Sequence, residues 1–351
     1  MQATQSAQSA QSTYRCACHG IDVHAHIVPA EFPRYLGAKA PRDWPSMQPA
    51  HACHRHVVID EKIYRTVSDL CWDTDKRLAD MDAQNVAIQA ISPMPELLSY
   101  WMEAADALPL LQYLNDTIAR MCEASAGRMV GLGAVPLQDV DMAIRELERL
   151  MRLPGFAGVE IGSNINGAPI GAAQFEAFFE ACEALGAAVF VHALRPAGKE
   201  RLVGPAQLVQ ALAFPTDVGL AAASAITSNL IVRHPKLRIA FSHGGGTLAS
   251  LLPRLEQASQ VFAPLRESLT LAPREQARRL WYDSLVFDAP TLRHLVETFG
   301  DTRLMLGTDY PFAFRERDPV GGVQALGLDA AAVERLIYRN AREFLGIRNG
   351  A

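Results

Sequence analysis

Positive charge is scarce in this 351-residue sequence. Lys and Arg number 33 against 38 Asp and Glu, which gives a formal net charge of −5, and no long basic run occurs. Because binding to nucleic-acid phosphates requires clustered Lys and Arg, we expect no nucleic-acid partner. The charged residues make up 20% of the chain, and their dispersal favours an ordinary solvated surface.

Cysteine is also scarce, and its spacing forms no disulfide framework. The six residues are Cys16, Cys18, Cys53, Cys71, Cys122 and Cys182. In a chain of this length they are most simply explained as reduced thiols of a cytoplasmic protein. The sequence CACH (16–19) precedes no matching second pair of ligands, so we expect no structural zinc site there.

Targeting and membrane-spanning signals are missing as well. Residues 1–19 have neither the basic start nor the apolar core of a secretory signal, and their repeated Gln-Ser-Ala predicts a flexible tail. The longest membrane-like stretch, VGLAAASAITSNLIV (218–232), is too short to span a bilayer and contains Ser, Thr and Asn. We interpret it as a buried helix and expect no membrane association.

Apolar residues, by contrast, are abundant at 49% and recur in eight β-branched runs. Helical patterns such as 141–152 and 172–186 lie between most of the runs. Near-continuous apolar strands that alternate with helices predict an α/β fold, a closed parallel (β/α)8 barrel of the TIM type. A doubly wound open sheet is the alternative, but no Gly-x-Gly-x-x-Gly opens a helix after a strand. The eight runs cover 21–26, 86–92, 129–136, 158–164, 187–193, 237–243, 280–287 and 303–310.

One segment does not fit the strand–helix unit. Residues 29–72 begin with an irregular Pro-rich stretch, and HVVIDEKIYRTV then alternates like a hairpin around Asp60-Glu61. We therefore predict a flexible tail over 1–19 and a single barrel domain over 20–351. Residues 29–72 form a small insertion after the first strand, on the face where active sites of such barrels assemble.

Metal-binding side chains stand at the ends of three predicted strands. In DVHAH, His24 and His26 are two residues apart, so both project from one face of the first strand. His192 ends the fifth strand, and Asp309 ends the eighth in LGTDYPF. Three imidazoles and a carboxylate that meet over the barrel mouth suit a divalent transition metal such as zinc. The alternative is four unrelated polar strand ends.

The sequences IDVHAH, VFVHA, SHGGG and LGTDYPF, in this order and spacing, resemble the amidohydrolase superfamily. The closer resemblance is to its aminocarboxymuconate-semialdehyde decarboxylase-like branch, and it extends over roughly residues 20–347. The resemblance implies that His24, His26, His192 and Asp309 hold one zinc ion and that His243 is the acid/base beside it. The alternatives for His243 are a fourth nitrogen ligand or a structural histidine.

The glycines after His243 would let the loop approach the substrate and turn at once into the next helix. At the end of the fourth strand, binuclear superfamily members carry a carboxylated lysine, whereas this chain has Glu160, which favours one metal. Glu160 is either an outer partner of the metal site or a barrel-lining carboxylate. Asp283 and Ser284 end the seventh strand, where they orient His243 or substrate or serve the structure alone.

The resemblance implies non-oxidative decarboxylation of an anionic substrate, for which arginine is the natural partner. Arg65 matches the insertion-hairpin arginine of the branch, and Arg254 matches an arginine that family members lend to the neighbouring subunit of a homodimer. Where the semialdehyde decarboxylases read His-Pro-Trp-Asp, this chain reads HALRPAGKERL and lacks that aromatic wall, with Arg195 nearby as a further anion contact. The alternative for each arginine is an ordinary surface residue.

We therefore expect a zinc-dependent decarboxylase of a small aromatic, heteroaromatic or muconate-type carboxylate, acting in the degradation of aromatic compounds. A hydrolase that opens a lactone, amide or imine with the same metal, or a hydratase, is the alternative. The cluster HACHRH contains His51, His54 and His56. Its irregular, Pro-rich context favours a solvated loop over a second metal site.

Overall fold

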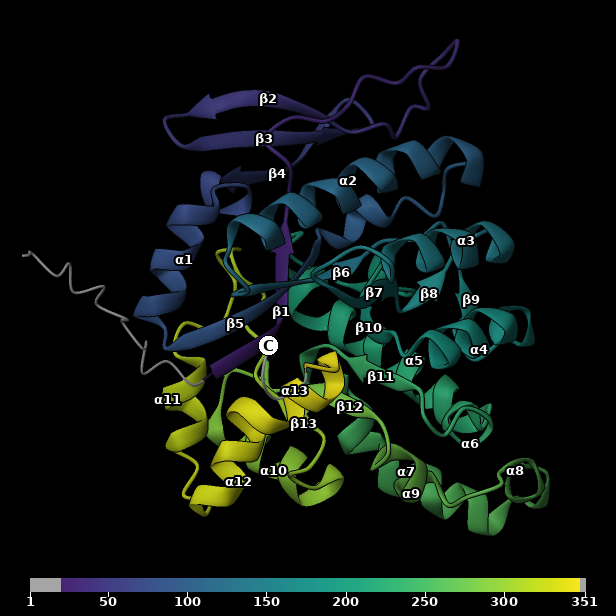
Figure 1. The fold of residues 1–351 in the computed structure, drawn as a ribbon. Coiled ribbons are helices and arrows are strands. Elements are labelled where there is room, and N and C mark those ends of the chain that lie inside the picture. The colour runs from purple at the N-terminus through teal and green to yellow at the C-terminus, as the bar shows by residue number, and fades with distance from the viewer. Residues whose placement is uncertain (1–19, 348–351) are drawn as a thin grey trace, which may run out of the picture.

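The structure is a computed structural model that describes residues 20–347, so the predicted tail, Cys16 and Cys18 lie outside the described residues. Eight parallel strands form one sheet in chain order (Figure 1). Backbone bridges from Asp22 to Leu306 and from Ala25 to Tyr310 join the first strand to the segment around the last, which closes the sheet. The predicted (β/α)8 barrel is confirmed. Its strands are β1 (Gly20–Ile27), β5 (Val86–Pro93), β6 (Met129–Gly133), β7 (Phe156–Gly162), β10 (Ala188–His192), β11 (Arg238–Phe241), β12 (Trp281–Asp283) and β13 (Leu304–Met305).

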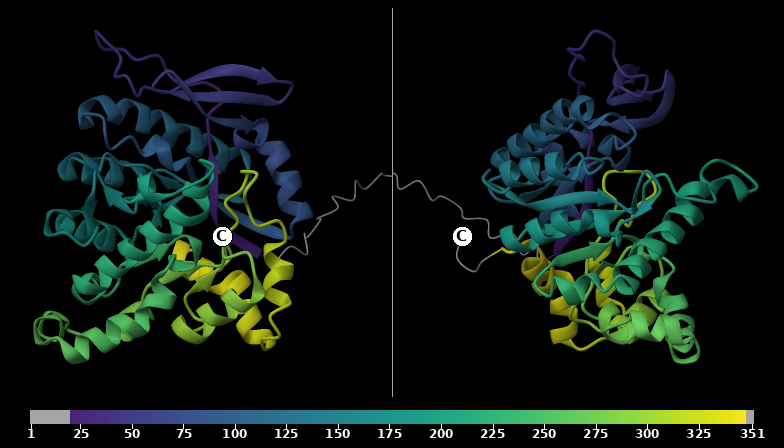
Figure 2. Two further views of the ribbon diagram at one scale, coloured as in Figure 1. Left: turned by 180° about the vertical axis from the view of Figure 1, so that it is seen from behind. Right: turned by 90° about the vertical axis from the view of Figure 1, so that its right-hand side faces the viewer.

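Helices surround the sheet on its outer side (Figures 1 and 2). Asp side chains cap several of them: Asp73 accepts from the N–H of Lys76 at the start of α1, and Asp139 accepts from that of Met142 at the start of α3. The helices are α1 (Thr74–Ala83), α2 (Ala104–Ala124), α3 (Val140–Leu150), α4 (Glu176–Leu185), α5 (Phe214–Thr227), α6 (Leu230–Arg233), α7 (Leu248–Val261), α8 (Ala263–Ser268), α9 (Pro273–Ala277), α10 (Ala289–Phe299), α11 (Pro319–Gln324), α12 (Ala330–Glu334) and α13 (Asn340–Leu345).

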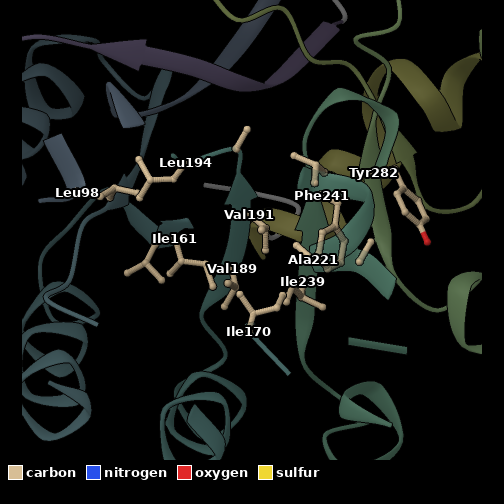
Figure 3. Close-up of a cluster of buried hydrophobic side chains, with 14 of the residues drawn as sticks. Leu98, Ile161, Ile170, Val189, Val191, Leu194, Ala221, Ile239, Phe241 and Tyr282 are labelled. Carbon is tan, nitrogen blue, oxygen red and sulfur yellow. The ribbon is translucent and has the colours of Figure 1, made fainter. Parts of the chain in front are cut away.

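The alternation of side chains along β10 separates the two apolar cores. Val189 and Val191 point outward and pack with Ile239 and Phe241 of β11 beneath the surrounding helices (Figure 3). Phe190 points inward and belongs to the cluster that fills the barrel together with residues of α13. Because side chains of a strand alternate between its faces, His192 shares the inner face with Phe190 and reaches the mouth of the barrel.

The last two strands are shorter than the sequence predicts. The apolar runs 280–287 and 303–310 suggest eight residues each, but β12 contains three residues and β13 contains two. Asp309 has a positive φ of 63°, and Phe287 one of 64°. Because this backbone conformation is incompatible with an extended strand, neither run continues as one strand to its predicted end.

The insertion contains a three-stranded antiparallel sheet of β2 (Ser46–His51), β3 (His54–Ile59) and β4 (Lys62–Ser68). The predicted turn at Asp60-Glu61 is present, and both residues have positive φ, as a two-residue hairpin turn requires. The prediction of a solvated loop over 51–56 was wrong, because these residues belong to a hairpin in which β2 and β3 pair across a turn at 52–53. Within residues 20–347, the metal-ligating cluster lies elsewhere, at the barrel mouth. A short second hairpin joins β8 (Asn164–Ile165) and β9 (Ala168–Pro169).

The apolar stretch predicted as one buried helix over 218–232 is in fact two helices. Asn229 has a φ of 56°, so α5 ends before it and α6 begins after it. In the described chain, the helical segment 209–227 is long and apolar enough to cross a membrane by length and composition. Half of it is buried inside the molecule, where α5 packs against α7 and α9.

Candidate metal centre and active site

Four side chains meet at the mouth of the barrel. Their ligand atoms all lie within 4.8 Å of one another. Nε2 of His26 is 3.1 Å from Nε2 of His24 and 3.1 Å from Oδ1 of Asp309, and His24 Nε2 is 3.5 Å from the same oxygen. Ligands about 2.0–2.1 Å from a tetrahedral ion are separated by about 3.3 Å, so these spacings fit one ion. The four are the predicted set: His24, His26, His192 and Asp309.

The hydrogen bonds of the three imidazoles also fit a metal. In each ring Nδ1 faces an acceptor: Asp283 Oδ2 at 2.6 Å for His24, the carbonyl of Pro93 at 3.1 Å for His26, and the carbonyl of Ala193 at 2.9 Å for His192. Because a neutral imidazole carries one proton, Nε2 is left as a lone-pair donor toward the cluster. Nε2 of His192 is buried and has no hydrogen-bond partner, as expected of an atom made to bind an ion.

The pKa values of the four ligand side chains shift in different directions. Burial alone would lower the pKa of His24, but the hydrogen bond and charge of Asp283 raise it to about 9. Burial lowers the pKa of His26 and lowers that of His192 well below its usual value. Burial acts to raise the pKa of Asp309, but its contacts with His26 and His24 outweigh this and lower it. The site therefore presents the carboxylate of Asp309 and the neutral imidazoles of His26 and His192, which are the forms that bind metal, whereas His24 must give up its extra proton when a metal binds.

His243 lies beside the cluster but contributes no ligand atom to it. Its ring centre is 5.4 Å from that of His24 and 5.1 Å from that of His192. Ser242 Oγ lies 3.1 Å from its Nδ1. Burial, followed by the charge of His24, lowers the pKa of His243 to about 4. The imidazole is thus neutral near pH 7.

The three glycines after His243 fit tightly against the protein itself. All have positive φ, and a Cβ on Gly246 would lie 1.9 Å from the carbonyl oxygen of Pro215 in α5. A Cβ on Gly245 would lie 2.6 Å from the ring of Tyr282. That the glycines approach the substrate stays a prediction; of the three, Gly246 lines the cavity described below. The others are required because the loop packs against β12 and its neighbours.

Two buried carboxyl groups, those of Asp283 and Glu160, lie next to the ligand histidines without belonging to the ligand cluster. Asp283 contacts His24, not His243, and its other oxygen accepts from the N–H of Gly244 at 2.7 Å. Glu160 accepts a 2.6 Å hydrogen bond from Ser92 Oγ, which lies 3.2 Å from Nδ1 of His26. Burial raises the pKa of Glu160 to about 8. Glu160 is therefore an outer partner of His26 through Ser92, one of the two roles that the sequence left open.

A cavity of about 260 Å³ opens over the cluster and is lined by His192, His243 and Asp309. Arg65 of the insertion reaches it, as does Glu96. The aromatic wall missing after the fifth strand is supplied by other elements. Phe214, Phe287, Phe312 and Phe314 all line this cavity. A largely apolar pocket with a few convergent polar groups is the usual form of a small-molecule site.

Comparison with known proteins agrees with this geometry. The amidohydrolase family profile matches residues 21–347. The 2-amino-3-carboxymuconate-6-semialdehyde decarboxylase of Dictyostelium discoideum is 35% identical over 93% of this chain and 91% of its own length. The chain belongs to the amidohydrolase family. Within it, the chain belongs to the branch of metal-dependent decarboxylases, which includes the gamma-resorcylate decarboxylase of Rhodococcus jostii, 25% identical over 76% of this chain and 89% of its own length.

Solved structures agree in fold. IDCase from Metarhizium anisopliae superposes with a TM-score of 0.79 at 20% identity and covers 93% of this chain and 97% of that protein. A dihydroxybenzoic acid decarboxylase from Polaromonas, solved with bound manganese, has a TM-score of 0.74 at 20% identity, over 95% and 98% of the two chains. Both likenesses support the barrel assignment.

The three predicted substrate arginines occupy different places. Arg65 lines the metal-site cavity. Arg195 instead places its guanidinium 3.2 Å from the ring centre of Trp101 and lines an adjoining cavity of about 460 Å³. Arg254 is exposed on α7 and is not among the described residues that line either cavity. Of these three arginines, Arg65 alone is therefore placed to meet a ligand over the cluster of its own chain.

Three residues near the cluster were not predicted from the sequence. Phe312 follows Asp309 by three residues and stacks on His26, with ring centres 5.4 Å apart. Glu96 lies in the turn after β5 and accepts a hydrogen bond from Tyr64 of the insertion. Phe214 begins α5, far from every ligand in the sequence. The ends of the barrel strands could have indicated Glu96 and Phe312, but nothing in the pattern singles out Phe214.

Proposed function

We propose that this enzyme catalyses the non-oxidative decarboxylation of a small aromatic, heteroaromatic or muconate-type carboxylate in the degradation of aromatic compounds, with zinc as its metal. The observation that carries the proposal is the four-ligand cluster at the floor of a cavity that also contains His243 and Arg65. The identity to the Dictyostelium enzyme supports the reaction class. A bound divalent ion supplies Lewis acidity that orients and polarises the substrate.

The roles of the protein groups follow from their places. The guanidinium of Arg65 pairs with a substrate carboxylate, for which its planar fork is suited. The imidazole of His243 takes up a proton from water and delivers it to the carbon that bears the leaving carboxylate, so that the net reaction consumes one solvent proton. The carbon–carbon bond then breaks, carbon dioxide leaves, and the substrate has exchanged a carboxylate for a hydrogen. The Phe side chains of the cavity hold the planar substrate and exclude water.

Zinc is our choice of metal because three imidazoles and one carboxylate form a nitrogen-rich set. Manganese is the competing ion, since it occupies the related Polaromonas structure. Metal content of the protein purified without added metal tests this choice. A predominance of manganese over zinc would overturn it and leave the reaction unchanged.

We also propose a homodimer in which Arg254 completes the site of the partner subunit. Arg254 is exposed on α7, away from the cavities of its own chain. Leu220 on α5 and Leu251 and Val261 on α7 are each at least 50% exposed, and α5 and α7 pack together. Exposed apolar side chains on adjacent helices are typical of an association surface. In Figure 2 these segments lie at the edge of the molecule.

A cytoplasmic location is proposed as well, because the described cysteines Cys53, Cys71, Cys122 and Cys182 are all free. Recovery of the enzyme in the soluble fraction of disrupted cells, separate from secreted and membrane fractions, is the expected result.

The reaction is tested with a panel of mono- and dicarboxylates of benzene, pyridine and conjugated dienes. We expect at least one to release one carbon dioxide per molecule of substrate consumed, as measured in the headspace and by mass spectrometry of the product. A product heavier than its substrate by one water, without carbon dioxide, would replace the proposal by a hydrolase or hydratase.

A further inference from the structure

The buried carboxylate of Asp283 joins two parts of the site. Its Oδ2 lies 2.6 Å from Nδ1 of His24, a metal ligand on β1. Its Oδ1 accepts hydrogen bonds from the backbone N–H of Gly244 at 2.7 Å and of Leu285 at 3.1 Å. Gly244 directly follows His243. One side chain therefore contacts both a metal ligand and the loop that carries the proton-transfer histidine.

The surroundings of Asp283 leave it little freedom. It is fully buried, at 0% exposure. Gly307, just after β13, lies against it, and a Cβ at this position would come within 2.6 Å of the Cβ of Asp283. Gly307 does not have a positive φ, so its lack of a side chain is explained by this close approach. The carboxylate is thus enclosed by β1, by the loop after β11 and by the segment after β13.

We propose that Asp283 is a positioning residue with two tasks: it keeps the proton of His24 on Nδ1, which frees Nε2 for the metal, and it fixes the loop of His243. A neutral imidazole carries its proton on either nitrogen, and the partner of one nitrogen decides the state of the other. A carboxylate only accepts hydrogen bonds, so it selects Nδ1–H. The second task rests on the proposed role of His243, whereas the first does not.

Asp283→Asn and Asp283→Ala distinguish this role from a packing role. Two backbone donors face Oδ1, so the oxygen of an Asn would stay there and its NH₂ would face Nδ1 of His24. The proton of His24 would then move to Nε2, the atom that faces the other ligands. Alanine removes the same charge but introduces no opposing donor. If packing were the only role, the similar shape of Asn would make it the milder substitution.

We expect the dissociation constant for Zn²⁺, measured by competition with a chelator, to rise about 10–100-fold in Asp283→Asn. The rise should be at least as large as in Asp283→Ala, and the absorption spectrum of the Co²⁺-loaded Asn variant should change. With metal saturating, kcat of the Ala variant should stay about 10-fold or more below wild type. Ser284→Ala is the control, because Ser284 contacts Gly307 and no ligand ring; it should match wild type in Zn²⁺ affinity.

Wild-type Zn²⁺ affinity in Asp283→Asn, or a much greater loss in Ala than in Asn, would overturn the first task. Full recovery of kcat by the Ala variant at saturating metal would overturn the second. Should the Asp283 variants fold poorly, Gly307→Ala tests the first task instead, because its added methyl group displaces the carboxylate of Asp283 without altering it. This variant should also bind Zn²⁺ more weakly than wild type, and unchanged Zn²⁺ affinity would overturn the first task. Zn²⁺ affinity requires no substrate, so the test of the first task stands even if the panel of carboxylates releases no carbon dioxide, whereas the test of the second task requires a substrate that turns over.

Discussion

The guanidinium of Arg65 lies 4.1 Å from the ring centre of Phe312. Phe312 in turn stacks on the imidazole of His26, with the ring planes 25° apart. A cation is attracted to the face of an aromatic ring, so Phe312 fixes an arginine of the insertion above the metal centre. Arg65 belongs to β4, which is not part of the barrel sheet. This contact therefore ties the insertion to the barrel mouth.

Phe312→Leu tests this arrangement. Leucine keeps an apolar side chain beside His26 but removes the ring that faces Arg65. We expect KM for the carboxylate to rise about tenfold, equivalent to a cation–π contact of about 1–2 kcal/mol, with metal content unchanged. Steady-state kinetics and elemental analysis provide the measurement. Phe314→Leu removes another aromatic side chain of the cavity, one that stacks on Phe287, and should raise KM less. Equal increases would contradict the role of Phe312.

Loss of one ligand should remove the metal. Nε2 of His192 is buried without a hydrogen-bond partner, so we expect His192→Ala to reduce bound metal from about one ion per chain to almost none. Activity should be lost with it, and a chelator should do the same to the wild type until Zn²⁺ is returned. His234→Ala is the control, since this nearly buried histidine contacts Glu176 instead. A metal-free preparation with full activity would refute the metal dependence.

His243→Asn should separate proton transfer from metal binding. His243 contributes no ligand atom to the cluster, so the variant should retain about one ion per chain, as measured by elemental analysis. Its kcat should fall by about 10²-fold or more, as is typical when a general acid/base is lost. Loss of the metal together with the activity would instead identify His243 as a ligand.

The glycine that ends the His243 loop should tolerate a side chain poorly. Gly246 has a φ of 58°, and its Cβ would lie 1.9 Å from a backbone oxygen, whereas Gly127 has a φ of 85° and open space around it. Alanine in this conformation costs about 1–2 kcal/mol. Gly127→Ala should lower the free energy of unfolding by about that much, and Gly246→Ala by clearly more, in denaturant titrations. Equal losses would contradict the predicted clash.

The barrel and its metal ligands were predictable because their signals are local. His24 and His26 show their shared face by a spacing of two, and His192 and Asp309 each end an apolar run. In a closed parallel barrel all such ends meet at one mouth, so spacing and topology together predict the cluster without any distance. The turn at Asp60-Glu61 was equally local, because an alternating pattern on both sides of this pair predicts a hairpin.

The remaining site features depend on packing between distant segments. Asp283 and His24 are 259 residues apart, so no spacing in the sequence pairs them. The glycines of the SHGGG loop are required because the loop packs closely against α5 and β12, and these contacts join segments that are distant in the sequence. The strand β2 was missed because its Pro-rich sequence has low intrinsic strand propensity, which pairing with β3 overrides.

The last prediction concerns sharing of the site between subunits. Arg65 lines the cavity of its own chain, whereas Arg254 is exposed on α7 away from it. If Arg254 serves the partner subunit, Arg65→Ala and Arg254→Ala should each be nearly inactive, because the anionic substrate loses a bidentate partner. Mixing the two variants and allowing subunits to exchange should restore activity. In a mixed two-fold dimer, one site contains both substitutions and the other contains neither.

Random exchange makes half of the dimers mixed, and half of their sites are intact, so roughly a quarter of wild-type activity should return. Exchange is verified independently by mass spectrometry of dimers that carry different tags, and each variant alone, incubated in the same way, is the control. If both arginines acted within one chain, every site would keep one defect and no activity would return. Confirmed exchange without recovery therefore refutes the shared site, because no other arrangement of intact sites is available to the mixture.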